Sequence, residues 1–137
     1  MIDLGAFLQE RLNWPRVPCE HDCCAFPAAW AMALGTADPM AKWRGTYSTE
    51  EQAEDIVARA GGLVGIFGAG LEGVGFVPLS DDDEPQPGDL GVIDLLGHEA
   101  GAIYTGRRWA YVADRGLGFA LLKREALSRV WRLPDHG

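Results

Sequence analysis

The stretch from Cys19 to Gly35 constrains the fold of this chain more than any other. All three cysteines of the 137-residue sequence lie within it, and residues 25–34 carry no charge and are rich in Ala, Leu and Met. These residues favour a helix, with Asp22 as a suitable N-cap and Gly35 as a suitable C-terminal stop. We therefore expect a buried, apolar helix over Cys23–Leu34.

This placement gives Cys23 and Cys24 two alternative roles. At the N-terminus of a helix, free backbone N–H groups and the helix dipole favour an anion, which stabilises a thiolate. A reactive, catalytic thiol is therefore one interpretation. The other is structural, because free cysteine is among the most buried residue types and often only fills space. The residues alone leave both open.

Helical and strand patterns occupy different halves of the chain. Apolar spacing predicts a helix over 3–12, and Ser48 or Thr49 caps a second over 49–60, which ends at two glycines. Residues 61–75 hold further glycines among apolar residues and predict no definite element beyond a short helical turn near Leu71. Short apolar stretches between turn residues predict strands over 75–79, 90–95, 100–105, 109–113, 118–122 and 129–133, with a brief helix at 123–127.

Helices followed by short strands predict an α+β fold, in which N-terminal helices pack on a C-terminal antiparallel sheet or small barrel. The length suits one domain, 1–137. A net charge of −8 disfavours nucleic acid as a partner, and no stretch approaches the roughly 20 apolar residues of a membrane span. The N-terminus has no signal-type pattern, so we expect synthesis in the cytoplasm, where disulfides are disfavoured. An acidic loop, 80–87, reads as a solvated segment rather than a calcium site.

Three short motifs occur in an order that resembles the NlpC-like branch of the papain-fold cell-wall peptidases. Asp22-Cys23-Cys24-Ala25 stands where that family has Asp-Cys-Ser-Gly, and Pro87-Gly88-Asp89 precedes an apolar strand as in the family. Ala100-Gly101-Ala102-Ile103-Tyr104 stands where the family has its base-bearing strand, His-Val-Gly-Ile-Tyr. The resemblance implies a papain-like fold and a catalytic Cys23. It also predicts that Cys23 is the more reactive thiol, with Cys24 turned into the core.

A closer resemblance joins Asp-Cys-Cys, the Trp43-Arg44-Gly45-Thr46-Tyr47 loop, the Gly-Asp strand and the terminal Trp131-Arg132-Leu133. This pattern is similar to a small family encoded by tailed phages and prophages, often beside tail-tip genes. It implies a virion protein in the phage tail, made in the host cytoplasm, with other tail-tip proteins as partners and peptidoglycan as a further ligand.

The sequence departs from the peptidase pattern at the catalytic base, because Ala100 occupies the position of the histidine. His98 lies two residues earlier, on the same face of an extended strand but roughly 6–7 Å further along. A thiol–imidazole pair needs about 2.6–3.2 Å, so His98 is a base only if a bulge at Gly97 returns it. His21 is a second candidate, as a cation beside the thiol, and Tyr111 and Asp114 are the candidates for orienting an imidazole.

Three functions follow from these residues. The first is a structural tail-tip protein that descends from a peptidase and has lost most activity. The second is an active cysteine peptidase that cleaves peptidoglycan peptides during cell entry, with candidate catalytic residues Asp22, Cys23, Cys24, His98 and His21 and no cofactor. The third is a metal-binding tail component, with Cys19, His21, Cys23 and Cys24 as ligands and zinc or an iron–sulfur cluster as the group bound.

Overall fold

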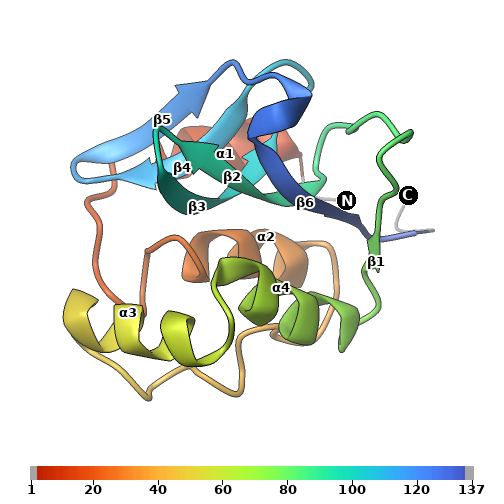
Figure 1. Cartoon of the computed structure of the whole chain (residues 1–137). Coiled ribbons are helices and arrows are strands. Elements are labelled where there is room, and N and C mark those ends of the chain that lie inside the picture. The colour runs from red at the N-terminus through yellow and green to blue at the C-terminus, as the bar shows by residue number, and fades with distance from the viewer. Residues whose placement is uncertain (1–2, 135–137) are drawn as a thin grey trace.

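The computed structural model describes residues 3–134, and four helices precede a six-stranded sheet (Figure 1). The helices are α1 (Leu4–Arg11), α2 (Ala25–Ala33), α3 (Glu50–Arg59) and α4 (Leu63–Glu72). The strands are β1 (Val77–Pro78), β2 (Leu90–Leu95), β3 (His98–Tyr104), β4 (Trp109–Ala113), β5 (Gly116–Ala120) and β6 (Leu127–Arg132), with a 3-10 turn at Arg124–Ala126. This order confirms the α+β class that the sequence predicts.

The sheet is antiparallel at every pairing within the described residues, with the strand order β1-β6-β2-β3-β4-β5. β2 to β5 form a meander, and β6 returns to pair with the free side of β2. β1 and β5 are the two edges, so these pairings make an open sheet. β3 therefore lies well inside the sheet and is held on both sides.

Three strands, β3, β5 and β6, begin two residues earlier than the sequence predicts. β3 starts at His98 rather than Ala100, because Leu96 and Gly97 make a two-residue turn and both have positive φ. β5 starts at Gly116 rather than Gly118, because its turn is equally tight. Two-residue turns with positive φ suit the twist of a hairpin.

The unassigned segment after Gly61 forms α4, a helix of ten residues. Its buried side chains, Leu63, Ile66, Phe67 and Leu71, recur at helical spacing. Its glycines permit close packing, since a Cβ at Gly70 would lie 2.2 Å from the carbonyl oxygen of Pro39. Glycine lowers helix propensity, so this helix depends on tertiary packing and its local sequence obscures it.

The main core lies between the helices and one face of the sheet. Figure 1 shows α2, α3 and α4 gathered on the same side of the sheet. Phe26 of α2, Phe67 of α4 and Trp131 of β6 are all almost completely buried in this core. A smaller cluster around Trp109 covers the opposite face. Within residues 3–134, no helix combines the length and the apolar character that a membrane crossing requires.

The start of α2 packs directly on β3. A Cβ at Gly101 would lie 2.0 Å from the carbonyl oxygen of Cys23 and 2.4 Å from the ring of Phe67. Real Cβ atoms do not approach other atoms this closely, so only glycine fits here. This contact fixes where the cysteines lie relative to the sheet.

Candidate functional site

Asp22 organises the segment that carries the cysteines. Its buried carboxylate accepts hydrogen bonds from the backbone N–H groups of Cys19 (2.8 Å), Cys24 (3.0 Å) and Ala25 (2.8 Å). The hydroxyl of Tyr47 donates a fourth, at 2.5 Å. Asp22 therefore caps α2 as the sequence predicts, although the helix itself begins at Ala25, two residues later than expected. These four contacts occupy the carboxylate and give it a structural role.

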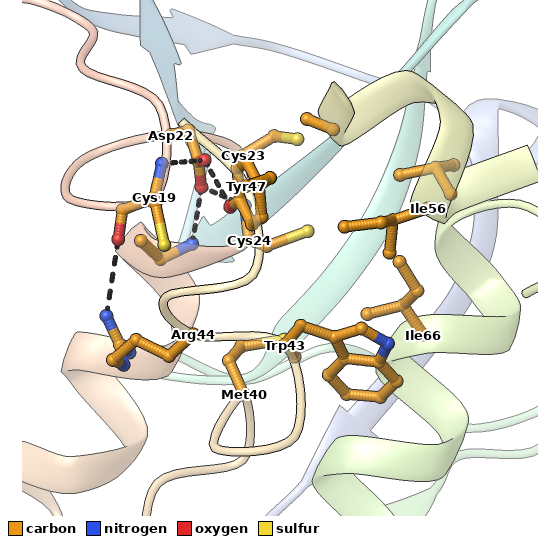
Figure 2. A pocket seen from close by; sticks show the side chains of 13 residues that line it. Cys19, Asp22, Cys23, Cys24, Met40, Trp43, Arg44, Tyr47, Ile56 and Ile66 are labelled. Atoms are coloured by element: carbon orange, nitrogen blue, oxygen red, sulfur yellow. Dashed lines mark hydrogen bonds between the residues drawn. The ribbon is translucent and has the colours of Figure 1, made fainter. Parts of the chain in front are cut away.

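Cys23 and Cys24 occupy the turn just before α2, and Figure 2 draws both side chains. The Cys23 side chain is partly exposed, whereas Cys24 is buried in the main core. Figure 2 shows the Cys24 sulfur directed toward Ile56 and Ile66. This burial agrees with the placement that the sequence predicts for Cys24; the relative reactivity of the two thiols stays a prediction.

The two thiols have opposite pKa shifts. A hydrogen bond from the Cys24 thiol lowers the pKa of Cys23, against the opposing effects of burial and of Asp22, and Arg16 and the backbone of Gly101 lower it further. The same hydrogen bond and burial raise the pKa of Cys24 well above its ordinary value. Since the thiolate is the nucleophile, these shifts favour Cys23 as the reactive thiol.

Cys23 lines a cavity of about 470 Å³ between α3 and the sheet. The opposite wall comes from the start of β3 and from β4, and includes His98, Ala100 and Tyr111. Apolar side chains of α3, Ala53 and Val57, cover the remaining side. The cavity is large enough for a peptide side chain and its neighbouring backbone, and mixed walls of this kind are typical of ligand sites.

His98 shares this cavity but does not reach the position of Ala100. The β2–β3 ladder runs without a register shift from Leu95 paired with His98 to Leu90 paired with Ile103. The bulge that His98 would need in order to serve as the base is therefore absent. The only irregularity in β2 lies on its other side, against β6. His98 is an exposed residue at the start of the strand, and its ring makes no hydrogen bond within residues 3–134.

His21 lies away from the cavity, in an aromatic cluster. Its ring packs edge-on against Trp14 and Phe26, and its Nε2 atom is buried without a hydrogen-bond partner. Burial, with a smaller contribution from the nearby Arg11, lowers the pKa of His21, although Asp22 opposes this. The ring is therefore neutral at pH 7, and the expected role as a cation beside the thiol does not fit this position.

The four residues proposed as metal ligands do not converge. The Cys19 sulfur accepts a hydrogen bond from the backbone N–H of Gly45 at 3.1 Å, on the side of the 43–47 loop. His21 faces its aromatic neighbours, and the Cys24 sulfur points into the core. Across residues 3–134, no three His, Cys, Asp or Glu side chains are grouped so as to hold a metal ion. The arrangement of the described residues therefore gives no support to the metal alternative.

A second, smaller cavity of about 40 Å³ lies on the Cys24 side of this segment (Figure 2). It is mainly apolar, with Met40, Trp43 and Ile66 among its walls. The 43–47 loop closes it, because Arg44 binds Asp38 at 2.6 Å and approaches the carbonyl oxygen of Cys19 at 3.5 Å. This space holds at most a water molecule or two. The main role of the loop is therefore to hold the cysteine segment in place, through its contacts with Cys19.

Two residues of the site escape a reading of the sequence. Tyr47 is the fourth partner of Asp22, and burial and this hydrogen bond raise its pKa strongly. Arg16 lines the larger cavity and binds the carbonyl oxygen of Val112 in β4 at 3.2 Å. Tyr47 belongs to the 43–47 motif loop, but no pattern pairs it with Asp22, and Arg16 belongs to no motif; both make contacts with residues distant in sequence.

The fold and the site together define an α+β protein with a partly exposed cysteine at the start of a buried helix, on the wall of a cavity. The family described as "Domain of unknown function (DUF6950)" matches residues 2–133. The chain therefore belongs to this family. No curated protein and no solved structure matches the chain.

Proposed function

We propose that this protein is a component of a phage tail tip with a papain-like, NlpC-related fold and a degenerate peptidase site. The ordered motifs support this ancestry. Asp22 and Cys23 precede α2, Gly88 and Asp89 precede β2, and Ile103 and Tyr104 end β3. In a papain-like arrangement the nucleophile lies at a helix N-terminus against a strand of the sheet, and Cys23 lies against Gly101 of β3. The tail-tip location rests on the resemblance to phage-encoded proteins.

The unbroken β2–β3 ladder is the observation that most strongly supports the proposal of a degenerate site. It leaves Ala100, a residue without a proton acceptor, on the wall of the Cys23 cavity where the base belongs. General-base catalysis contributes typically 10²–10⁴-fold to a rate, so most peptidase activity would be lost with the histidine.

The start of α2 is also poorly suited to hold an oxyanion. The backbone N–H groups of Cys24 and Ala25 are both bound to the Asp22 carboxylate. Of the three N–H groups of Cys23, Cys24 and Ala25, that of Cys23 alone makes no hydrogen bond within residues 3–134. Removing one oxyanion donor from an enzyme costs on the order of 10²–10³-fold in kcat, so the loss of donors adds to the loss of the base.

In this role the protein would hold other tail-tip proteins, and its cavity would bind peptides of peptidoglycan without efficient cleavage. The test compares cleavage of purified peptidoglycan by wild type, Cys23→Ala and His98→Ala, together with the morphology of virions from a phage that lacks the gene. We expect little or no cleavage by all three proteins, and deletion virions without complete tail tips. Normal virions after deletion would refute the tail-tip assignment.

An active cysteine peptidase is the second candidate, and one observation favours it. Cys23 and His98 line the same cavity, and the pKa of Cys23 is lowered. In this mechanism Cys23 gives its proton to His98, and its sulfur attacks the peptide carbonyl carbon. The C–N bond then breaks, the amine leaves with the proton from His98, and water hydrolyses the thioester. Robust cleavage by wild type that both variants lose would establish this candidate and overturn the degenerate site.

A further inference from the structure

Arg16 lines the larger cavity and is held there by contacts with β4, α3 and the residue that follows β4. Its backbone N–H binds the carbonyl oxygen of Asp114 at 3.2 Å, and its guanidinium binds the carbonyl oxygen of Val112 at 3.2 Å. The side chain also pairs with Glu50 of α3 at 3.2 Å and with Asp114 at 3.4 Å. These contacts hold a permanent cation between β4 and α3, on the wall that it shares with Cys23.

The other charged groups of this cavity cannot serve as a cation for the Cys23 sulfur. Asp22, Glu50, Glu54 and Glu99 are acidic, and His98 is an exposed imidazole at the far end of the wall. Tyr111 lines the cavity and the Cys24 thiol lies beside Cys23, but neither a phenol nor a thiol can carry a positive charge. Within residues 3–134, Arg16 is therefore the permanent cation that lines the cavity.

We propose that Arg16 supplies the counter-charge of the Cys23 thiolate, in the place that an imidazolium occupies in thiol peptidases. This inference rests on the Cys23 site of the proposed function and makes Arg16 a positioning residue. The tethers to β4 fix the guanidinium, and α3 contributes Glu50, which weakens its effect on the sulfur. The electrostatic effect of Arg16 on Cys23 has the sign that this role requires.

The consequence for chemistry is a thiolate without a base. A guanidinium stays protonated and cannot accept the thiol proton, which must go to solvent. The reactivity of Cys23 should therefore follow a single ionisation. It should not need His98, in contrast to a thiol–imidazole pair, whose activity depends on both groups.

The test is the rate of alkylation of Cys23 by iodoacetamide between pH 5 and 10, followed by peptide mapping on the intact chain. The thiolate attacks the methylene carbon, an S–C bond forms, the C–I bond breaks and iodide leaves. We compare wild type with Arg16→Gln, Arg16→Lys and His98→Gln. Arg59→Gln is the matched control, because Arg59 pairs with Asp55 on the exposed face of α3 and lines neither cavity.

We expect Arg16→Gln to move the midpoint of reactivity to higher pH and to lower the rate at pH 7 by about 3- to 10-fold. The plateau at high pH should stay that of wild type, and Arg16→Lys should keep more than half of the effect. His98→Gln and Arg59→Gln should match wild type. If Arg16→Gln also matches wild type, the inference is overturned while the proposed function stands.

A second pair of variants tests Arg16 without removing its tethers. Glu50→Gln removes a carboxylate that contacts Arg16, and Glu54→Gln removes one that lines the same cavity without that contact. We expect Glu50→Gln to shift the midpoint to lower pH by more than Glu54→Gln does. Equal shifts would mean that the carboxylates act on the sulfur directly and would contradict the role of Arg16. A wild-type Cys23 that reacts only at the pH of an ordinary thiol would overturn this inference as well.

Discussion

The larger cavity is lined by residues at the start of α2 and by residues of β3, and these two regions differ in how many contacts hold their side chains in place. On the α2 side, the Asp22 carboxylate joins three backbone N–H groups and Tyr47, and Cys23 lies in a fixed place against Gly101. On the β3 side, His98 is an exposed strand end whose ring makes no hydrogen bond within the described residues. The side of the cavity that carries Cys23 is thus fixed by several hydrogen bonds, whereas the His98 ring on the β3 side is fixed by none within the described residues.

If the proposed descent from a peptidase holds, this difference indicates which part of the ancestral site would still contribute to the fold. The Asp22 network positions the cysteines and also ends the preceding loop and begins α2, so stability maintains it whether or not the thiol reacts. A catalytic imidazole has no such second role. Its loss from β3 leaves the ladder intact, because backbone groups alone form the pairing with β2. A degenerate site with an intact nucleophile wall is the expected result.

The largest expected effect is the removal of the Asp22 carboxylate. Asp22→Ala leaves buried donors without partners, each at a cost of about 1–3 kcal/mol, so we expect the free energy of unfolding to fall by about 3–4 kcal/mol in urea denaturation. The matched control is Asp94→Ala on the β3 side, where an exposed carboxylate accepts one hydrogen bond from Gly97 at 2.7 Å. We expect less than about 1 kcal/mol there. Equal losses for the two variants would remove the contrast between the walls.

The next effect concerns the point where β3 meets Cys23. In Gly101→Ala the new methyl group would collide with the carbonyl oxygen of Cys23, which is backbone and cannot rotate away. We expect a loss of about 2–3 kcal/mol in the free energy of unfolding, together with a changed alkylation rate of Cys23. Gly68→Ala in α4 is the control, since its Cβ would meet the flexible Glu72 at 3.5 Å and the Trp131 ring at 4.0 Å, both ordinary contacts. That variant should be neutral or slightly stabilising. A similar loss of unfolding free energy in both variants would mean that replacing a glycine is costly in general, and that the contact with Cys23 is not the cause.

A smaller effect separates the role of His21 from that of the cavity. Its pKa is lowered in the folded chain, so the unfolded chain binds the proton more readily. The contribution to stability is therefore present above the ordinary pKa of about 6.5 and is lost as the pH falls through the lower folded value, with a slope of at most about 1.4 kcal/mol per pH unit. His21→Phe should flatten the stability profile between pH 7 and 5.5 and leave Cys23 alkylation unchanged. A loss of Cys23 alkylation in this variant would show that His21 contributes to the reactivity of the thiol.

The sequence predicts the helix order, the cap at Asp22 and most strands, because these depend on local patterns of apolar and capping residues. It leaves α4 unassigned, since glycines hide a helix that tertiary packing stabilises. For the site, the Asp-Cys motif predicts the partly exposed Cys23 and the buried Cys24. Arg16 and Tyr47 could not be found this way, because each reaches the site across more than twenty residues of sequence. The sequence left open whether Gly97 makes a bulge or a turn, and the structure has a two-residue hairpin turn there.

The most direct test of the account restores the missing base. Ala100→His introduces an imidazole at the position that the proposed papain-like arrangement assigns to the base, and Ala100 is among the residues that line the cavity with Cys23. We predict that purified peptidoglycan is cleaved at least about 10-fold faster by this variant than by wild type, and that Cys23→Ala in the same background abolishes the gain. Two results together would contradict a degenerate site. Wild type would already cleave efficiently through His98, and an Ala100→His variant, shown to be folded by its thermal melting, would cleave no faster.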